Sequence, residues 1–341
     1  MQSRKNTYSG RTVTDIYDFI NSIQHITQWR SLTEAIGYRF RPNGKTTDRM
    51  IAEFESYWRR THQLILKKVS ATRGSFGIDI GCGNGEFLST ARSLGVRTLG
   101  ITLSPAQADY CRGQGLTVQV ASYRDQVFIR ANKGKVDFIT LIGSIEHFTN
   151  PYELAQQQRD NPQNANLVQE SRKSVYIEMF RILKTLLKPG GKVYISCCAF
   201  NSVHPTPIQI IRNPVLSLVI DGWDQFHASL LQRALHGYYP DQGMLSDCAH
   251  SAGFIELEHE NGTNDYHQTS EYWWYLIRHA FKTKPLPMIW KSLTFFSRRP
   301  YHALITLVNT LTESWPWQFR PRHQGTPVML ERLVFQKPNK D

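Results

Sequence analysis

The sequence predicts an α/β protein with a doubly wound, mostly parallel sheet, N-terminal helices and an inserted helical lid. Strand-like and helix-like stretches alternate from residue 76 to residue 200, which is typical of a parallel sheet covered on both faces. A glycine-rich bend, GIDIGCGNGEF at 77–87, begins with the first strand of this series. Because open parallel sheets bind ligands beyond the carboxyl ends of their strands, we expect a ligand site at this bend.

The length and composition are those of a globular protein. The chain has 341 residues, 40% of them hydrophobic, which suits one elaborated domain or two small ones. No apolar signal segment follows MQSRKNTYSG, and no run approaches the roughly 20 apolar residues of a membrane span. The five cysteines are odd in number and lack CxxC spacing, so we interpret them as reduced thiols. These features favour a cytoplasmic protein without a metal site.

The net charge of +12 favours an anionic partner. Phospholipid headgroups and a diphosphate or carboxylate substrate are the candidates, and charge that serves solubility alone is the alternative. Nucleic acid is disfavoured, because the basic residues are scattered and form no recognisable nucleic-acid module. The partner we expect is a small molecule or lipid-like substrate, an anionic one included, and we expect a monomer or homodimer.

Three regions are expected along the chain. Residues 1–75 are predicted to form a helical cap, because DIYDFINSI and RMIAEFESYWRRTHQLILKKV carry apolar residues at three-to-four spacing. Residues 76–200 are predicted to form the ligand-binding core, and residues 201–341 to hold the lid and the closing strands of the sheet. A polar segment, 151–173, is interpreted as a surface insertion.

The core elements follow one another in a regular order. Strands are expected at GIDI (77–80), RTLGITL (97–103), LTVQVAS (116–122), VDFITLI (136–142) and KVYISCCAF (192–200), and later at GFIELEHE (253–260) and LERLVFQK (330–337). Helices are expected at GEFLSTARSLG (85–95), SPAQADYCRGQG (104–115) and SVYIEMFRILKTLL (174–187). Gly95 is suited to end the first helix. Ser104 and Gln107 at the start of the second have the spacing of a capping box.

The spacing of the glycines limits which ligands the bend is expected to bind. Glycines let the backbone approach a ligand closely and adopt angles closed to other residues. The order here is GxGxG, whereas a dinucleotide fingerprint reads GxGxxG. That fingerprint also requires an acid about 20 residues later, where this chain has GITLS. A nicotinamide cofactor is therefore disfavoured.

A DxGxGxG stretch followed by a helix resembles the S-adenosylmethionine-dependent class I methyltransferases, which have a Rossmann-like fold. LLKPGGKVYIS and the helix from Ser104 also match that class in order. GITLSPAQADYCRGQGLTVQVASYRD, VDFITLIGSIEHF, MLSDCAHSAGF and DYHQTSEYW are more narrowly similar to the cyclopropane-fatty-acid synthase and mycolic acid cyclopropane synthase family. The likeness is good over 77–150 and 175–200, moderate over 244–275 and poor before residue 75.

This resemblance implies S-adenosyl-L-methionine as the cofactor and specific residues around it. The residues expected to bind it are Tyr38, Asp79, Gly81, Cys82, Gly83, Asn84, Gly85, Thr102, Leu103, Ser104, Gln107, Ser122, Tyr123 and Gly143. Thr102 and Ser104 can alternatively serve only to cap a helix. The residues expected to act in catalysis are Glu146, His147 and Tyr266.

In that family an alkene attacks the cofactor's methyl group, and a bicarbonate held by a Cys, a Glu and a His is thought to remove a proton afterwards. Glu146 matches the glutamate, but the histidine position falls on Ser196, and IGYRF at 36–40 stands near the expected cysteine position. Glu146 is therefore expected to be the base itself, unless the chemistry needs none there. A supporting role for Glu146 and a structural role for His147 are the alternatives.

The late part of the chain is rich in aromatic residues that could stabilise a carbocation. We expect the substrate cavity to include at least one of Tyr266, Tyr272, Trp273, Trp274, Tyr275, Trp290, Phe295, Phe296 and Tyr301. PLPMIWKSLTFFSRRP and YHALITLVNTL are expected to form amphipathic helices, suited to a lid or to peripheral membrane contact.

The function expected is C-methylation of an alkene-bearing lipid or isoprenoid-like substrate. A small-molecule N-, O- or S-methyltransferase is the alternative on the same scaffold. A non-catalytic binding or scaffolding protein is the third class, and the intact glycine bend disfavours it.

Overall fold

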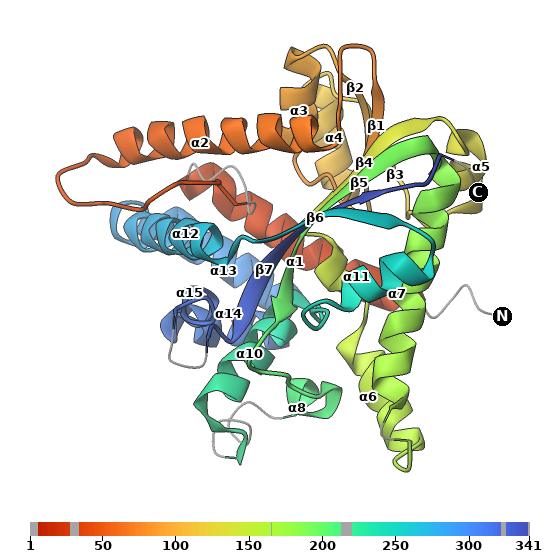
Figure 1. Ribbon diagram of the computed structural model, residues 1–341. Helices are drawn as coiled ribbons and strands as arrows, with labels where there is room; N and C mark the ends of the chain where they lie inside the picture. Colours follow the sequence, from red (N-terminus) through yellow and green to blue (C-terminus); the bar gives the residue numbers. More distant parts are fainter. Residues whose placement is uncertain (1–5, 28–33, 165, 213–219, 322–324, 340–341) are drawn as a thin grey trace.

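A seven-stranded sheet forms the centre of the molecule, with the strand order β3-β2-β1-β4-β5-β7-β6 (Figure 1). The computed structural model describes residues 6–27, 34–164, 166–212, 220–321 and 325–339. The strands are β1 (Phe76–Ile80), β2 (Arg97–Thr102), β3 (Val118–Val120), β4 (Val136–Ile142), β5 (Leu187–Phe200), β6 (Ile255–Asn261) and β7 (Val328–Gln336). The neighbours from β3 to β5 pair in parallel, and β7 pairs antiparallel with both β5 and β6. The expected mostly parallel, doubly wound α/β sheet is confirmed.

Helices cover the sheet where the sequence alternates. They are α3 (Glu86–Ser93), α4 (Pro105–Gly113), α5 (Gln126–Asn132), α6 (Pro151–Asp160), α7 (Leu167–Leu186) and α11 (Met244–Ser251). The apolar faces of α7 and α11 pack on the central strands, where Phe180, Leu183 and Leu245 are fully buried. Residue Gly95 has a left-handed φ of 73° just after α3, as its position predicted.

One local expectation was wrong, and one helix begins earlier than expected. Ser104 accepts a hydrogen bond from the Gln107 amide (3.1 Å), but the Gln107 side chain accepts one from Thr102 (2.7 Å) and does not complete a capping box. The helix expected to begin at residue 174 begins at Leu167, and the segment 151–173, interpreted as a surface insertion, forms α6 and the first turns of α7. Asn150 caps α6, whose apolar residues Leu154 and Ala155 are buried.

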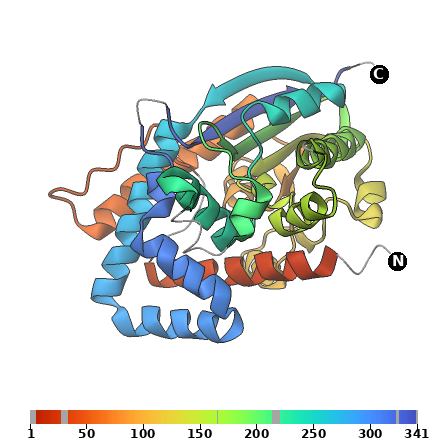
Figure 2. The ribbon, with the colours of Figure 1, turned by 90° about the horizontal axis from the view of Figure 1, so that it is seen from below.

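The remaining helices lie before the core and between its last strands. They are α1 (Asn6–Thr27), α2 (Thr47–Lys68), α8 (Pro207–Ile211), α10 (Gly222–Leu235), α12 (Thr263–Thr283), α13 (Pro285–Arg298), α14 (Pro300–Leu311) and α15 (Ser314–Trp317). Figure 2 shows α1 running beside the corner formed by α13 and α14. The Phe19 ring of α1 stacks on Phe295 of α13 at 4.3 Å between centroids. The division of the chain at residues 75 and 200 stays a prediction.

A second apolar core joins the lid to the sheet. Tyr272 and Trp273 of α12 pack with Phe54 of α2 and with Phe200 of β5. An ion cluster lies beside this core: Arg332 of β7 contacts both Glu34 and Asp265, each at 2.6 Å. Among the described residues, no helix combines the length and the apolar character that crossing a membrane requires.

Candidate active site

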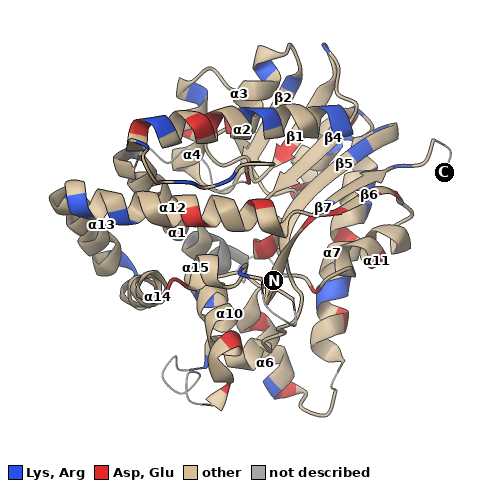
Figure 3. Ribbon diagram, turned by 60° about the vertical axis from the view of Figure 1, so that its left-hand side comes forward, with Lys and Arg blue, Asp and Glu red and all other residues tan. Residues whose placement is uncertain are grey.

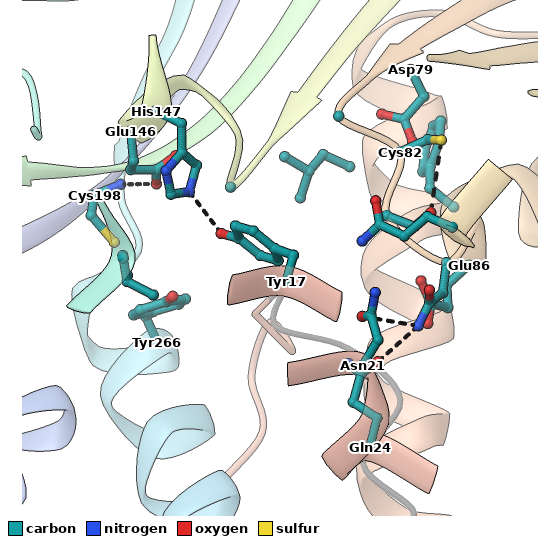
Figure 4. Close-up of a pocket in the computed structure, with 18 of the residues that line it drawn as sticks. Tyr17, Asn21, Gln24, Asp79, Cys82, Glu86, Glu146, His147, Cys198 and Tyr266 are labelled. Atoms are coloured by element: carbon teal, nitrogen blue, oxygen red, sulfur yellow. Dashed lines mark hydrogen bonds between the residues drawn. The ribbon is translucent and has the colours of Figure 1, made fainter. Parts of the chain in front are cut away.

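A cavity of ≈ 110 Å³ lies beyond the carboxyl ends of β1 and β4, where the glycine bend predicts a ligand site (Figure 4). The bend forms one wall, the segment after β4 forms another, and α1 and the lid close the rest. The lining residues are Tyr17, Asn21, Gln24, His62, Asp79, Gly81, Cys82, Gly83, Asn84, Glu86, Phe87, Gln107, Ile142, Gly143, Glu146, His147, Cys198, Leu235, Tyr239, Tyr266 and Trp315.

The three glycines of the bend are needed for different structural reasons. All have left-handed φ angles, of 80° at Gly81, 52° at Gly83 and 79° at Gly85. A Cβ on Gly81 would lie 2.5 Å from the Ser144 Cβ, and one on Gly85 would lie 2.6 Å from Leu116. Both glycines are therefore required by packing. A Cβ on Gly83 would meet no atom within 4 Å, so Gly83 leaves open volume beside bare main chain.

Helix α1 closes the cavity over the glycine bend. The Asn84 side-chain amide donates to Gln24 at 2.7 Å and to Asn21 at 3.4 Å. Both partners lie on α1, and Figure 4 shows them facing the bend. The resemblance covers the first 75 residues poorly, so sequence reasoning missed these contacts. The only available signal was the polar pair three residues apart on a predicted helix.

Asp79 is a buried carboxyl group at the end of β1. Its Oδ1 accepts a hydrogen bond from the Thr140 hydroxyl at 2.7 Å. Burial raises the pKa of Asp79 to about 7, and the Thr140 hydrogen bond opposes part of that rise. Asp79 therefore exchanges a proton near neutral pH, and its ionised form can accept hydrogen bonds from a bound polar group.

Glu146 lies in a short 3-10 turn, η1 (Ile145–His147), directly after β4. Gly143 has a left-handed φ of 64° and turns the chain there. The Glu146 Oε1 accepts a hydrogen bond from the Cys198 amide at 2.8 Å. Its Oε2 is buried and has no hydrogen-bond partner among the described residues. Burial raises the pKa of Glu146 to about 7, against the opposing effect of the Cys198 amide, which is a value suited to a general base.

His147 stands beside Glu146 and joins it to α1. The Tyr17 hydroxyl lies 2.7 Å from the His147 Nε2. Burial lowers the pKa of His147 to about 4, so the imidazole is neutral at neutral pH. Its Nδ1 is buried and unpartnered among the described residues. Burial also raises the pKa of Tyr17, and the Glu146 carboxylate adds to that rise.

Aromatic rings form the wall opposite the glycine bend. Tyr266 lies between Trp315, at 6.5 Å, and Phe319, at 4.8 Å between ring centroids. Tyr239 and Tyr17 add two further rings to the cavity. The expectation that at least one of the late aromatic residues lines the cavity is met by Tyr266, while Trp315 was not among those proposed.

The structure brings many of the predicted site residues together. Those that line the cavity are Asp79, Gly81, Cys82, Gly83, Asn84, Gln107, Gly143, Glu146, His147 and Tyr266. Their roles in binding and catalysis stay predictions.

Other predicted residues lie outside the lining. They are Tyr38, Gly85, Thr102, Leu103, Ser104, Ser122 and Tyr123. Thr102 and Ser104 are buried by the start of α4, and Ser104 donates to Asp18 of α1 at 2.9 Å. Leu103 is 52% exposed. Tyr123 stacks on Phe148.

The residues at the expected histidine and cysteine positions do not line the cavity, whereas Glu146, His147 and Tyr266 do. Ser196, at the expected histidine position, donates to Glu34 at 3.0 Å and does not line the cavity. Tyr38 of IGYRF packs edge-to-face on Phe54, at 5.2 Å between centroids. The cysteine beside Glu146 is Cys198, at the end of β5. The strand-end rule that located the glycine bend could also have pointed to Cys198.

Comparisons with known proteins agree with this geometry. A family model described as a methyltransferase domain matches residues 50–259. No curated protein sequence matches the chain. Among solved structures, the cyclopropane synthase MmaA2 from Mycobacterium tuberculosis is 17% identical, with a TM-score of 0.62 over 96% of this chain and 98% of that one.

Two further solved structures share the fold. The mycolic acid cyclopropane synthase CmaA1, complexed with SAH and CTAB, is 19% identical, with a TM-score of 0.64 over 96% of this chain and 98% of that one. The geranyl diphosphate C-methyltransferase from Streptomyces coelicolor, in complex with Mg²⁺, geranyl diphosphate and S-adenosyl-L-homocysteine, is 13% identical. Its TM-score is 0.58 over 97% of this chain and 98% of that one.

Proposed function

The chain belongs to the methyltransferase-domain family, and on that premise we propose that it C-methylates an alkene-bearing lipid or isoprenoid-like substrate. The observation that carries the proposal is the pairing of two features across one cavity. A glycine bend leaves open volume beside bare main chain, and a buried, unpartnered Glu146 oxygen lies in the same cavity.

The residues present fit S-adenosyl-L-methionine. Gly83 and Gly143 both have left-handed φ angles, and a Cβ on either would meet nothing within 4 Å. Asp79, Asn84 and Gln107 supply polar atoms around that volume. When bound, the cofactor supplies an electrophilic methyl group on a positively charged sulfonium. The chain's residues would hold the acceptor in line with it and exclude water.

The cavity requires an opening movement before it can admit this cofactor. Its ≈ 110 Å³ is below the roughly 300–1,000 Å³ typical of small-molecule sites. The Tyr17, Asn21 and Gln24 side chains on α1 form part of its lining. We infer that α1 moves away from the glycine bend to enlarge the site and returns to close it.

Glu146 is suited to remove the proton that an alkene acceptor must lose after it gains a methyl group. Its Oε2 is free to accept that proton, and the Cys198 amide holds the other oxygen in place. The rings of Tyr17, Tyr239 and Tyr266 line the same cavity, and the electron-rich faces of aromatic rings stabilise a cationic centre before the proton leaves. The neutral His147 adds no competing positive charge there.

A small-molecule N-, O- or S-methyltransferase is the alternative. There Glu146 would remove the proton from the attacking atom, so its raised pKa supports that reaction too. The aromatic wall favours the alkene, because a heteroatom acceptor needs no cation-stabilising rings.

The lid also supports peripheral contact with an anionic membrane. On α13 and α14, exposed apolar side chains include Leu286 at 78%, Trp290 at 70% and Leu311 at 74%. Residues 272–312 contain six Lys or Arg and no Asp or Glu. Figure 3 shows blue segments and no red ones on α13. Apolar faces edged by cations suit a phospholipid surface.

The acceptor is identified by incubating the enzyme with methyl-labelled S-adenosylmethionine and lipid extracts, followed by mass spectrometry. We expect label on a carbon of an alkene-bearing lipid or isoprenoid. Label on nitrogen, oxygen or sulfur would establish the alternative function.

A further inference from the structure

A second cavity, of ≈ 460 Å³, lies beside the first one, at the corner between α13 and α14. Its lining residues are Thr12, Asn150, Tyr152, His236, Arg298, Arg299, Pro300, Tyr301 and His302. This lining contains two arginines and two histidines and no carboxylate. We propose that it binds the phosphate or diphosphate group of the methyl acceptor, an inference that rests on the proposed function.

Buried polar groups in this cavity lack partners. His236 is 6% exposed, and neither of its ring nitrogens has a hydrogen-bond partner among the described residues. The Tyr152 hydroxyl and the His302 Nε2 are also buried and unpartnered in the described part of the chain. Leaving such buried groups without hydrogen-bond partners destabilises the folded protein. Burial lowers the pKa of His236 to about 4 and also lowers the pKa of His302, so both rings are neutral and each has one N–H to donate. The oxygens of an anion would accept hydrogen bonds from these N–H groups and from the Tyr152 hydroxyl.

Two helix N-termini add to the same cavity. The 12-residue α14 begins at Pro300, and no side chain caps its first turn. Helix α6, of 10 residues, begins at Pro151, with Asn150 and Tyr152 in the lining. The Tyr152 amide at the start of α6 already donates to the Asn150 side chain, whereas the first turn of α14 has no side-chain cap. The dipoles of both helices favour an anion at these ends.

The charges around the cavity leave Arg298 available. Arg299 donates to Asp15 of α1 at 2.7 Å, so part of its charge is already compensated. Asp18 accepts a hydrogen bond from Ser104. Burial raises the pKa of Asp18, and the Ser104 hydrogen bond and the charge of Arg298 oppose that rise. Neither aspartate lines the cavity. Arg298 is exposed and forms no ion pair within 4 Å to a described carboxylate.

The position suits the anionic end of a substrate whose other end lies at Glu146. The same three segments line both cavities: α1 with Tyr17 and Thr12, the turn after β4 with His147 and Asn150, and the end of α10 with Leu235 and His236. Tyr17 and Thr12 are about 7.5 Å apart along the helix axis. A phosphate bound here would therefore fix the position of the reacting carbon relative to Glu146.

The test is calorimetric titration of the full chain with pyrophosphate. We expect Arg298→Gln to weaken binding at least tenfold, and Lys291→Gln to change it less than twofold. Lys291 lies on the same helix and carries the same charge, but does not line the cavity. His236→Asn is the second variant, because asparagine tolerates the left-handed φ of 52° at this position, and we expect it to weaken binding as well.

The phosphate could belong to a soluble phosphate ester or to a lipid headgroup. A second experiment distinguishes the two by measuring binding to phosphatidylcholine vesicles with and without phosphatidylglycerol. Arg298-dependent binding of pyrophosphate indicates a soluble phosphate ester. Binding of the anionic vesicles alone, lost more in Arg298→Gln than in Lys291→Gln, indicates a lipid headgroup. Equal losses in the two variants with both probes, or no binding of either probe, would overturn the inference.

Failure of the proposed function is recognised separately. If the wild-type chain takes up no S-adenosylmethionine while pyrophosphate binding still depends on Arg298, the methyltransferase proposal fails and the anion site stands.

Discussion

Gly83 has a left-handed backbone and faces open cavity volume, so a side chain there would occupy the space we assign to the cofactor. We expect Gly83→Val to abolish S-adenosylmethionine binding while the chain still folds. Calorimetric titration with the cofactor measures this. Retained micromolar binding would refute the assignment of the glycine bend.

A valine at residue 83 would both strain the backbone and fill cavity volume, and a matched variant distinguishes these two effects. Gly134 also has a left-handed φ, of 65°, and open space around a built Cβ, but it lies in the turn after α5, outside the cavity lining. Gly134→Val should share the strain cost of about 1–2 kcal/mol and keep cofactor binding. If both variants lose binding alike, strain and not volume is responsible.

Glu146 is expected to act as a base whose ionisation sets the pH dependence of turnover. Because burial raises its pKa to about 7, kcat should rise with pH through that value. Glu146→Gln should lower kcat by about 10²–10⁴-fold and leave cofactor affinity within threefold. Steady-state kinetics from pH 5 to 9, with cofactor titrations, test this. Equal losses of turnover and cofactor affinity would make Glu146 a binding residue.

The same raised pKa predicts that Glu146 costs stability at high pH. Burial favours the protonated carboxyl in the folded state. The free energy of unfolding is therefore unaffected by this group below its ordinary pKa of 4.5, and it falls as the pH rises from there to about 7. The loss totals about 3 kcal/mol. Glu146→Gln should therefore match the wild type in denaturant unfolding at pH 4 and exceed it by about that amount at pH 8. Equal stability at both pH values would show that Glu146 is not desolvated.

At the scale of elements, local patterns predicted the strands and most helices well. GIDI, VDFITLI and LERLVFQK form β1, β4 and most of β7, because short apolar runs between turn residues have few alternatives. No helix was expected within the segment 151–173, because its many Gln and Asn residues make it polar. Burial of Leu154 and Ala155 stabilises α6 there, and such tertiary packing is not visible in a local pattern.

The candidate site was predictable only where one continuous motif carries it. The glycine bend and Glu146 each follow a strand whose end fixes their place. Tyr17, Gln24 and Trp315 reach the cavity from helices far away in sequence, so no local spacing marks them. Thr102 and Ser104 were expected in the cofactor pocket by resemblance, with helix capping as the alternative. Their hydroxyls form hydrogen bonds around the start of α4, and a role in the pocket stays a prediction.

Helix α1 is expected to control entry to the cofactor site through its contact with the glycine bend. Gln24→Ala removes the 2.7 Å hydrogen bond to Asn84, at a cost of about 0.5–1.5 kcal/mol. We expect cofactor association and dissociation to accelerate severalfold, followed by stopped-flow fluorescence of Trp315. Asn21→Ala, which removes only the 3.4 Å contact, should have a smaller effect. Unchanged rates in both variants would contradict a closing role for α1.

At the scale of the whole molecule, a series of side-chain contacts connects the lid to the glycine bend. Phe295 of α13 stacks on Phe19 of α1, and Gln24 of α1 contacts Asn84 of the bend. A surface that binds α13, as proposed above, would therefore contact an element two contacts away from the glycine bend. This arrangement would let a membrane present its lipid while α1 opens.

Membrane contact is expected to combine apolar insertion with the net charge of +12. The wild type should bind phosphatidylglycerol-containing vesicles, with affinity that falls as salt rises, and Trp290 emission should shift to the blue on binding. Leu286→Ser with Trp290→Ser should lower the affinity at least tenfold in vesicle sedimentation. Val127→Ser, at an equally exposed apolar residue (69%) on α5, should leave it unchanged. If all three chains sediment alike, the charge alone accounts for binding and the lid face has no part in it.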